Sequence, residues 1–211
     1  LFLVIIFLSI AIHEFAHAWT ADMAGDPTPR FYGRVTLNPL AHLDPMGSIM
    51  IIFTTMAGFG IGWGKPVLVN PSKMRNPRWD HFFSVAAGPL SNLIQAAIYA
   101  LTARLLVGAG VIAPMVENQI DTVGSALLFG VIVNINLAFF NLIPFGPLDG
   151  HWLVGLMMPE KPRYHWFKFC HTAGGPILLA VILLSQFQGF SITRFIFGAP
   201  IDWLTRFLLG F

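Results

Sequence analysis

The stretch LFLVIIFLSIAIHEFAHAWTADMA, residues 1–24, predicts the core of the fold. It is apolar and long enough for a helix that crosses a bilayer, which takes about 20 residues. Within it lies the motif HEFAH at residues 13–17. Positions four apart share one face of a helix, so His13 and His17 can reach one metal ion while Glu14 projects beside it. Ionisable side chains are costly in a membrane, which indicates that these three have a function.

The H-E-x-x-H motif favours one Zn²⁺ per chain. Zinc binds imidazole nitrogen readily, and a catalytic zinc site keeps one position for water. A carboxylate beside that water, here Glu14, can act as the general base of a hydrolysis. The alternative is that the two histidines cap a buried helix end by bonding to carbonyl groups. Burying His-Glu-His without a metal or partners would carry a large free-energy cost, so the metal site is favoured.

Asp149 is the best candidate for the third metal ligand. The expected topology brings it to the same side as His17, and Pro147 and Gly150 allow the chain to break around it. The alternative is that Asp149 caps the segment that follows. Asp44 is a rival ligand, although its place before a proline is more typical of a turn. The other histidines lie outside any metal-ligand spacing and are interpreted mainly as interface residues: His42, His81, His151, His165 and His171. His151 is close enough to Asp149 to be a further candidate ligand.

Composition points to an integral membrane protein. Of the 211 residues only 10% are charged, against about 25% in soluble domains, and the mean hydropathy is +0.70. The formal net charge of +2 is too small to suggest nucleic-acid binding. The single cysteine, Cys170, excludes an intrachain disulfide framework.

The predicted fold is an all-α polytopic membrane protein with about 4–6 transmembrane helices and a small membrane-associated β-rich insertion after the first helix. Residues 1–211 are read as a single membrane-embedded metalloprotease domain, with a catalytic core at 1–158 and C-terminal hydrophobic segments at 159–211. Three long helices are predicted, over 1–24, 81–108 and 122–143. Shorter apolar segments follow at 151–158, 173–188 and 195–210, with a basic, aromatic loop at 159–168. Charged residues in the last segment favour a place at the membrane interface.

The β-rich insertion is expected over residues 31–70, because β-prone runs there lie between Gly, Asn and Pro turn signals. Basic residues precede and follow it, and basic residues favour the cytoplasmic side of a membrane. The insertion is therefore predicted to be re-entrant or interfacial, so that both basic clusters lie on one side. A conventional span at 45–62 is the alternative.

Three motifs resemble the site-2 protease family of intramembrane zinc metalloproteases: HEFAH at 13–17, AGPLSN at 87–92 and NLIPFGPLDG at 141–150. The stretches at 33–45 and 62–67 are similar to the compact prokaryotic members, which lack an inserted PDZ or CBS domain. The resemblance covers residues 1 to about 160.

This resemblance implies that His13, His17 and Asp149 bind zinc and that Glu14 activates the water. It also implies that Asn141 positions the substrate or stabilises the oxyanion, since a side-chain amide can bind developing negative charge. The alternative is that Asn141 caps a broken helix end. Residues 33–37 and 65–69 would pair with an unwound substrate strand, or else form a hairpin that shields the site.

The expected function is intramembrane zinc endopeptidase activity on the transmembrane segments of other proteins. The expected location is a prokaryotic plasma membrane, with the active site toward the cytoplasm. A non-proteolytic metal-binding or transport protein is the first alternative, but it would need further ionisable groups in the membrane. A zinc enzyme acting on prenylated protein termini is the second, but it would need a well-placed glutamate as third ligand.

Overall fold

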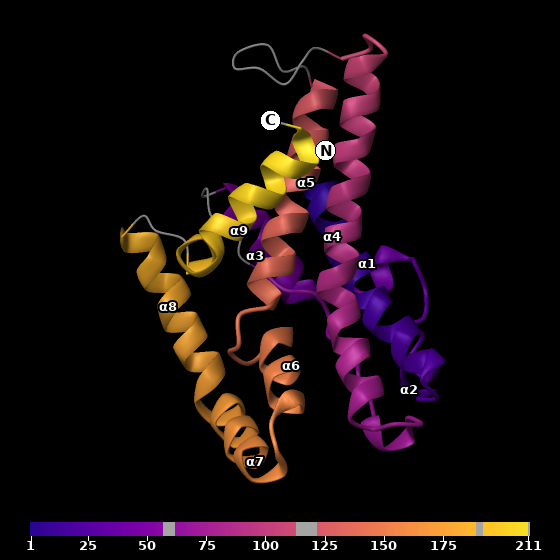
Figure 1. The fold of residues 1–211 in the computed structure, drawn as a ribbon, viewed down its shortest axis with the longest axis vertical. Helices are drawn as coiled ribbons and strands as arrows, with labels where there is room; N and C mark the ends of the chain where they lie inside the picture. The colour runs from indigo at the N-terminus through magenta and orange to yellow at the C-terminus, as the bar shows by residue number, and fades with distance from the viewer. Residues whose placement is uncertain (57–61, 113–121, 189–191, 211) are drawn as a thin grey trace.

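The computed structural model describes residues 1–56, 62–112, 122–188 and 192–210. In these ranges the chain is helical, with short irregular connections (Figure 1). The helices are α1 (Phe2–Met23), α2 (Thr28–Phe31), α3 (Pro45–Met56), α4 (Trp79–Gly108), α5 (Thr122–Asn141), α6 (Asp149–Met157), α7 (Glu160–Phe169), α8 (Gly175–Gln188) and α9 (Ile192–Leu209), with short 3₁₀ turns η1 (Pro39–Ala41) and η2 (Pro71–Lys73).

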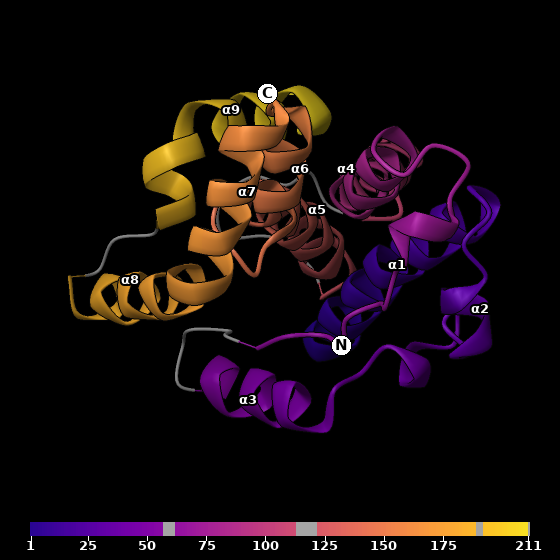
Figure 2. The same cartoon turned by 90° about the horizontal axis from the view of Figure 1, so that it is seen from below.

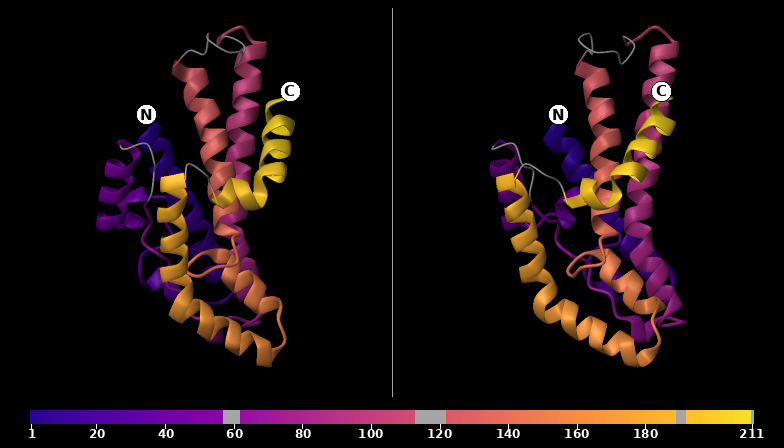
Figure 3. Two further views of the ribbon diagram at one scale, coloured as in Figure 1. Left: turned by 90° about the vertical axis from the view of Figure 1, so that its left-hand side faces the viewer. Right: turned by 60° about the vertical axis from the view of Figure 1, so that its left-hand side comes forward.

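In the part of the chain that the structure describes, four helical stretches are long and apolar enough to cross a membrane: α1, α4, α5 and the continuous stretch Glu160–Leu184. The long helices predicted from the sequence are present, with ends within two residues of the expected ones. Helices α1, α4 and α5 lie side by side and form the centre of the molecule (Figures 1 and 3).

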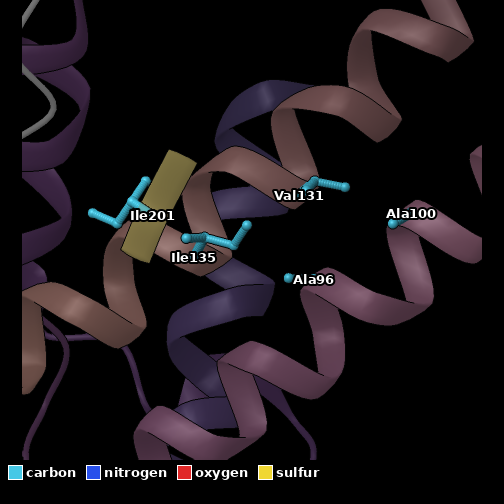
Figure 4. Packing of buried hydrophobic residues seen from close by; sticks show 5 residues of the cluster. All are labelled: Ala96, Ala100, Val131, Ile135 and Ile201. Atoms are coloured by element: carbon cyan, nitrogen blue, oxygen red, sulfur yellow. The ribbon is translucent and has the colours of Figure 1, made fainter. Parts of the chain in front are cut away.

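Small residues allow this close packing. Ala96 and Ala100 of α4 face Val131 and Ile135 of α5, and Ile201 of α9 closes the cluster (Figure 4). All five are nearly inaccessible to solvent. Helix α9 is kinked at Phe197 and, as expected from its charges, is not among the four candidate spans.

The predicted basic loop at 159–168 is wrong, because these residues form α7. A π-helical turn, η3 (Cys170–Gly174), joins α7 to α8, and the two make one long bent helix (Figure 3). The turn packs closely against the loop that precedes α6, since a Cβ on Gly174 would lie 3.0 Å from the carbonyl oxygen of Gly146. The sequence did not reveal this helix, because a basic, aromatic composition occurs both in loops and in helices that lie along the membrane surface.

The predicted β-rich insertion is also wrong. In the described part of residues 31–70 there is no strand, and its only β contact is an isolated bridge between Leu43 and Gly64. Two Asn-Pro pairs explain the outcome: the side chains of Asn38 and Asn70 accept the backbone N–H of Leu40 and Ser72 and start 3₁₀ turns. Proline cannot donate to a ladder, so the β-prone runs have no continuous partner.

The insertion begins and ends at the same end of the bundle. Arg75 donates from its backbone N–H to the carbonyl of Ala24, and its Nη2 donates to the carbonyl of Met23. Helix α3 has 12 residues, or about 18 Å, whereas the hydrocarbon core is about 30 Å thick. Helix α3 is therefore too short to span by itself, and Figure 2 shows α3 outside the α1, α4 and α5 core.

Candidate metal centre

The three predicted metal ligands meet inside the bundle. The Nε2 atoms of His13 and His17 lie 3.0 Å apart, and Asp149 Oδ2 lies 3.2 Å and 3.4 Å from them respectively. Three tetrahedral ligands about 2.0–2.1 Å from a zinc ion would be separated by about 3.3 Å. Among the described residues, this is the one group of three or more His, Cys, Asp or Glu side chains close enough to share an ion.

The ring tautomers leave both Nε2 atoms as acceptors. His17 Nδ1 lies 2.8 Å from the carbonyl oxygen of Ser84, which can only accept, so Nδ1 carries the proton. His13 Nδ1 lies 2.6 Å from Asn92 Oδ1, also an acceptor. Two lone pairs therefore face a carboxylate oxygen, and Asp149 Oδ2 is buried without a hydrogen-bond donor. These groups repel one another unless a cation lies between them, so the donor set fits Zn²⁺.

The electrostatics of Asp149 agree with a cation site. Burial raises the pKa of the Asp149 carboxyl group, but the charges and hydrogen bonds of His17 and His13 together lower that pKa below its ordinary value, so the group is ionised. A bound metal cation would supply that charge while His17 stays neutral.

Helix α6 presents Asp149 in its first turn, after the chain break at residues 142–148. Leu148, not Asp149, is the N-cap residue, so the capping alternative for Asp149 is wrong. A Cβ on Gly150 would lie 2.3 Å from the carbonyl oxygen of Leu142, so only glycine permits this close return of the chain. At the other end of α6, Arg78 donates from Nε to the carbonyl of Leu156 at 2.7 Å and thereby caps the helix.

Helix α4 approaches the ligands closely at Gly88. A Cβ there would lie 2.3 Å from the Cε1 and Nε2 atoms of His17 and 2.7 Å from Cε1 of His13. The absence of a side chain at Gly88 therefore makes room for both imidazole rings.

Glu14 lies in the wall of a cavity of about 560 Å³ beside the ligands. Its Oε2 accepts the backbone N–H of Val67 at 3.2 Å, so the irregular segment after α3 holds the carboxylate. The wall also includes His81 and Asn141. Asn141 is the last residue of α5, and its Nδ2 donates to the carbonyl of Leu137 at 2.9 Å, within its own helix. The structure thus brings Asn141 to the cavity wall, with its side-chain amide bonded within α5.

The rival ligand Asp44 has another partner, and so has the buried Asp26 that follows α1. Asp44 accepts the backbone N–H of Gly47 at 2.8 Å, as expected of a turn residue. Asp26 is fully buried and accepts the backbone N–H groups of Thr28 and Asn70.

The interface interpretation is wrong for three of the remaining histidines. His42, His81 and His151 are buried, whereas His165 and His171 are exposed. His42 Nε2 lies 2.8 Å from the carbonyl oxygen of Thr36, and His81 packs against Trp152 beside the cavity. Sequence reasoning also missed the hydrogen-bond partners of the ligands, because nothing in the spacing of α4 relates it to HEFAH.

Comparison with known proteins gives a consistent picture. The chain matches the sequence model of peptidase family M50 over residues 1–126 and 109–185. It is 37% identical over 158 residues to "Putative zinc metalloprotease YwhC" of Bacillus subtilis, covering 74% of this chain and 68% of that protein.

Two mycobacterial relatives are more distant. "Putative zinc metalloprotease Rip2" of Mycolicibacterium smegmatis is 28% identical over 157 residues, and its Mycobacterium tuberculosis counterpart is 29% identical over 163. Each alignment covers 74% of this chain and 57% of the relative, so the chain spans less than two thirds of the length of these relatives. No solved structure matches significantly.

Proposed function

The chain belongs to peptidase family M50, the site-2 protease family of zinc metalloproteases, and on this basis we propose that it cleaves peptide bonds within membrane-spanning segments of other proteins. One observation carries the proposal: the donor atoms of His13, His17 and Asp149 converge within a bundle whose helices are long and apolar enough to span. A protease site inside such a bundle would meet substrates that are themselves in the membrane.

His13, His17 and Asp149 would hold the zinc ion, which would supply a Lewis acid that polarises the scissile carbonyl and lowers the pKa of water. Glu14 takes a proton from the attacking water and later gives it to the leaving amine nitrogen. The Val67 N–H holds Oε2 of Glu14 and so fixes the direction of the carboxylate. Asn141 binds the substrate carbonyl after its Nδ2 leaves the Leu137 oxygen.

The substrate must unwind locally before it is cut, because each carbonyl in a regular helix is engaged in an intrahelical hydrogen bond. The cavity beside Glu14 is of the size usual for ligand sites, about 300–1,000 Å³, and so can hold an unwound stretch of peptide.

The chain is an integral membrane protein, and the proposed location is a prokaryotic plasma membrane with the active site toward the cytoplasm. The supporting observation is that basic residues gather at one end of the helix bundle. Residues 24 and 75 lie together there, and Arg78 bonds to the end of α6, which leads directly into the basic helix α7. Basic residues favour the cytoplasmic side.

The test uses the full chain in bacterial membrane vesicles, with mass spectrometry of new peptide termini in the endogenous membrane proteins. We expect the wild type to produce termini inside spanning segments and Glu14→Gln to produce none while retaining zinc. Glu160→Gln is the matched control, because the Glu160 side chain is exposed on α7 and is not among the described residues that line the cavity beside the ligands. Wild-type cleavage by Glu14→Gln, or termini confined to loops outside the membrane, would overturn the proposal.

A further inference from the structure

A network of hydrogen bonds between buried polar side chains of α1, α4 and α5 leads to the metal centre. His13 Nδ1 of α1 lies 2.6 Å from Asn92 Oδ1 of α4. Asn92 Nδ2 donates to Asn134 Oδ1 of α5 at 2.9 Å, and Asn134 Nδ2 donates to Ser9 Oγ of α1 at 2.9 Å. Ser9, Asn92 and Asn134 are 1%, 0% and 0% exposed. A polar group in the membrane interior needs a hydrogen-bond partner, and here each of the two asparagine amides has one for its oxygen and one for its nitrogen.

Backbone carbonyls determine which atom donates and which accepts in this network. Asn134 Nδ2 also donates to the carbonyl of Gly130 at 2.9 Å, and Asn92 Nδ2 is 3.4 Å from the carbonyl of Ser9. A carbonyl oxygen can only accept, so the NH₂ group of each asparagine must point toward it. Asn92 Oδ1 is then left to face His13 as an acceptor.

The orientation of Asn92 determines which nitrogen of His13 is available to a metal. Because Oδ1 accepts, His13 must carry its proton on Nδ1, and Nε2 keeps the lone pair that points toward His17 and Asp149. In the opposite tautomer a proton on Nε2 would occupy the place of the metal. The other histidine has a backbone carbonyl as its partner, that of Ser84, so Asn92 is the side chain through which this effect can be tested.

We propose that Asn92 is a positioning residue of the zinc centre, which holds the His13 ring in the tautomer and orientation that bind the metal. Asn134 and Ser9 hold Asn92 in turn. The inference rests on the zinc-binding part of the proposed function. Partners that orient a ligating histidine typically change metal affinity roughly 10- to 100-fold when removed.

The test measures the zinc dissociation constant of the full chain in detergent, by competition with a chromogenic chelator. Asn92→Leu removes the acceptor at similar size, and we expect roughly 10- to 100-fold weaker zinc binding. Asn92→Asp keeps an acceptor oxygen toward His13 but loses the Nδ2 donor to Asn134, so we expect it to bind zinc more tightly than Asn92→Leu while being less stable than the wild type. The absorption spectrum of bound Co²⁺ is a second readout, because it reports coordination geometry and not stability.

Two controls separate positioning from general packing. Asn136→Leu removes an asparagine of α5, the helix that carries Asn134, whose Nδ2 donates to the carbonyl of Ile132 in its own helix. Val131→Ala opens the core between α4, α5 and α9 away from the metal ligands, so it lowers stability without touching His13. Both should bind zinc as the wild type does, with an unchanged Co²⁺ spectrum.

The outcomes are distinguishable. If the wild type binds no zinc, the proposed function itself fails. If the wild type binds zinc and Asn92→Leu binds it equally well, the positioning inference is overturned while the proposed function stands. Equal losses in Asn92→Leu and Val131→Ala would also overturn it. Should Asn92→Leu fail to fold, Asn92→Ser takes its place: wild-type zinc affinity with an unchanged Co²⁺ spectrum would contradict the inference, and a tenfold or greater loss with an altered spectrum would support it.

Discussion

Replacing Gly88 by alanine should abolish tight zinc binding. The added Cβ would lie 2.3 Å from Nε2 of His17, the atom expected to bind the metal, and 2.7 Å from Cε1 of His13. Ordinary contacts between such heavy atoms are about 3.5–4.0 Å, so the ring or the helix must move by about 1 Å. Metal sites tolerate deviations of about 0.2 Å in ligand distance, so a shift of this size removes a ligand.

The expected size of the effect is a loss of zinc affinity on the order of 100-fold or more, which corresponds to about 2.8 kcal/mol. The helix itself should not suffer, because alanine in a helix interior is more favourable than glycine by about 0.5–1 kcal/mol. The variant should therefore keep its helical content while it loses zinc.

The assay is a zinc titration of the purified chain in detergent after removal of metal with EDTA, with circular dichroism on the same samples. Gly108→Ala is the matched control, since Gly108 ends the same helix and a Cβ there would meet no atom within 4 Å. Zinc binding by Gly88→Ala within threefold of the wild type would refute the close approach of α4 to the two rings.

Three further changes test the placement of α6 and the surroundings of Glu14. Gly150→Ala should weaken zinc binding at least tenfold, measured by the same titration, because a Cβ would press on the carbonyl of Leu142 and displace the adjacent Asp149. Arg78→Gln should lower thermal stability by about 1–3 kcal/mol, measured by unfolding in detergent, because the carbonyls at the end of α6 lose a charged donor; an unchanged unfolding temperature would contradict this role. Val67→Pro should lower peptidase activity roughly tenfold at unchanged zinc content, because proline removes the N–H that holds Glu14, whereas Val67→Ala keeps the N–H and should stay near wild-type activity.

Much of the bundle could be predicted because its signals are local. Each long helix is a run of apolar residues that needs no distant partner to be recognised, and its ends lie at prolines, glycines and charged residues. The insertion after α1 could not be predicted in this way. Its β-prone runs are real, but strand formation needs a neighbouring strand, and the turns started by Asn38 and Asn70 provide none.

The sequence by itself determined the membrane class and half of the metal centre. The low fraction of charged residues and the high mean hydropathy are averages over the chain and do not depend on its fold. The common face of His13 and His17 follows from the helical period alone. Only the tertiary structure decided that Asp149 reaches these two side chains, that Gly88 makes room for their rings, and that Asn92 orients one of them. These are contacts between helices far apart in the chain, and their geometry is set by how the small residues of α4 and α5 pack against α1, which no local pattern encodes.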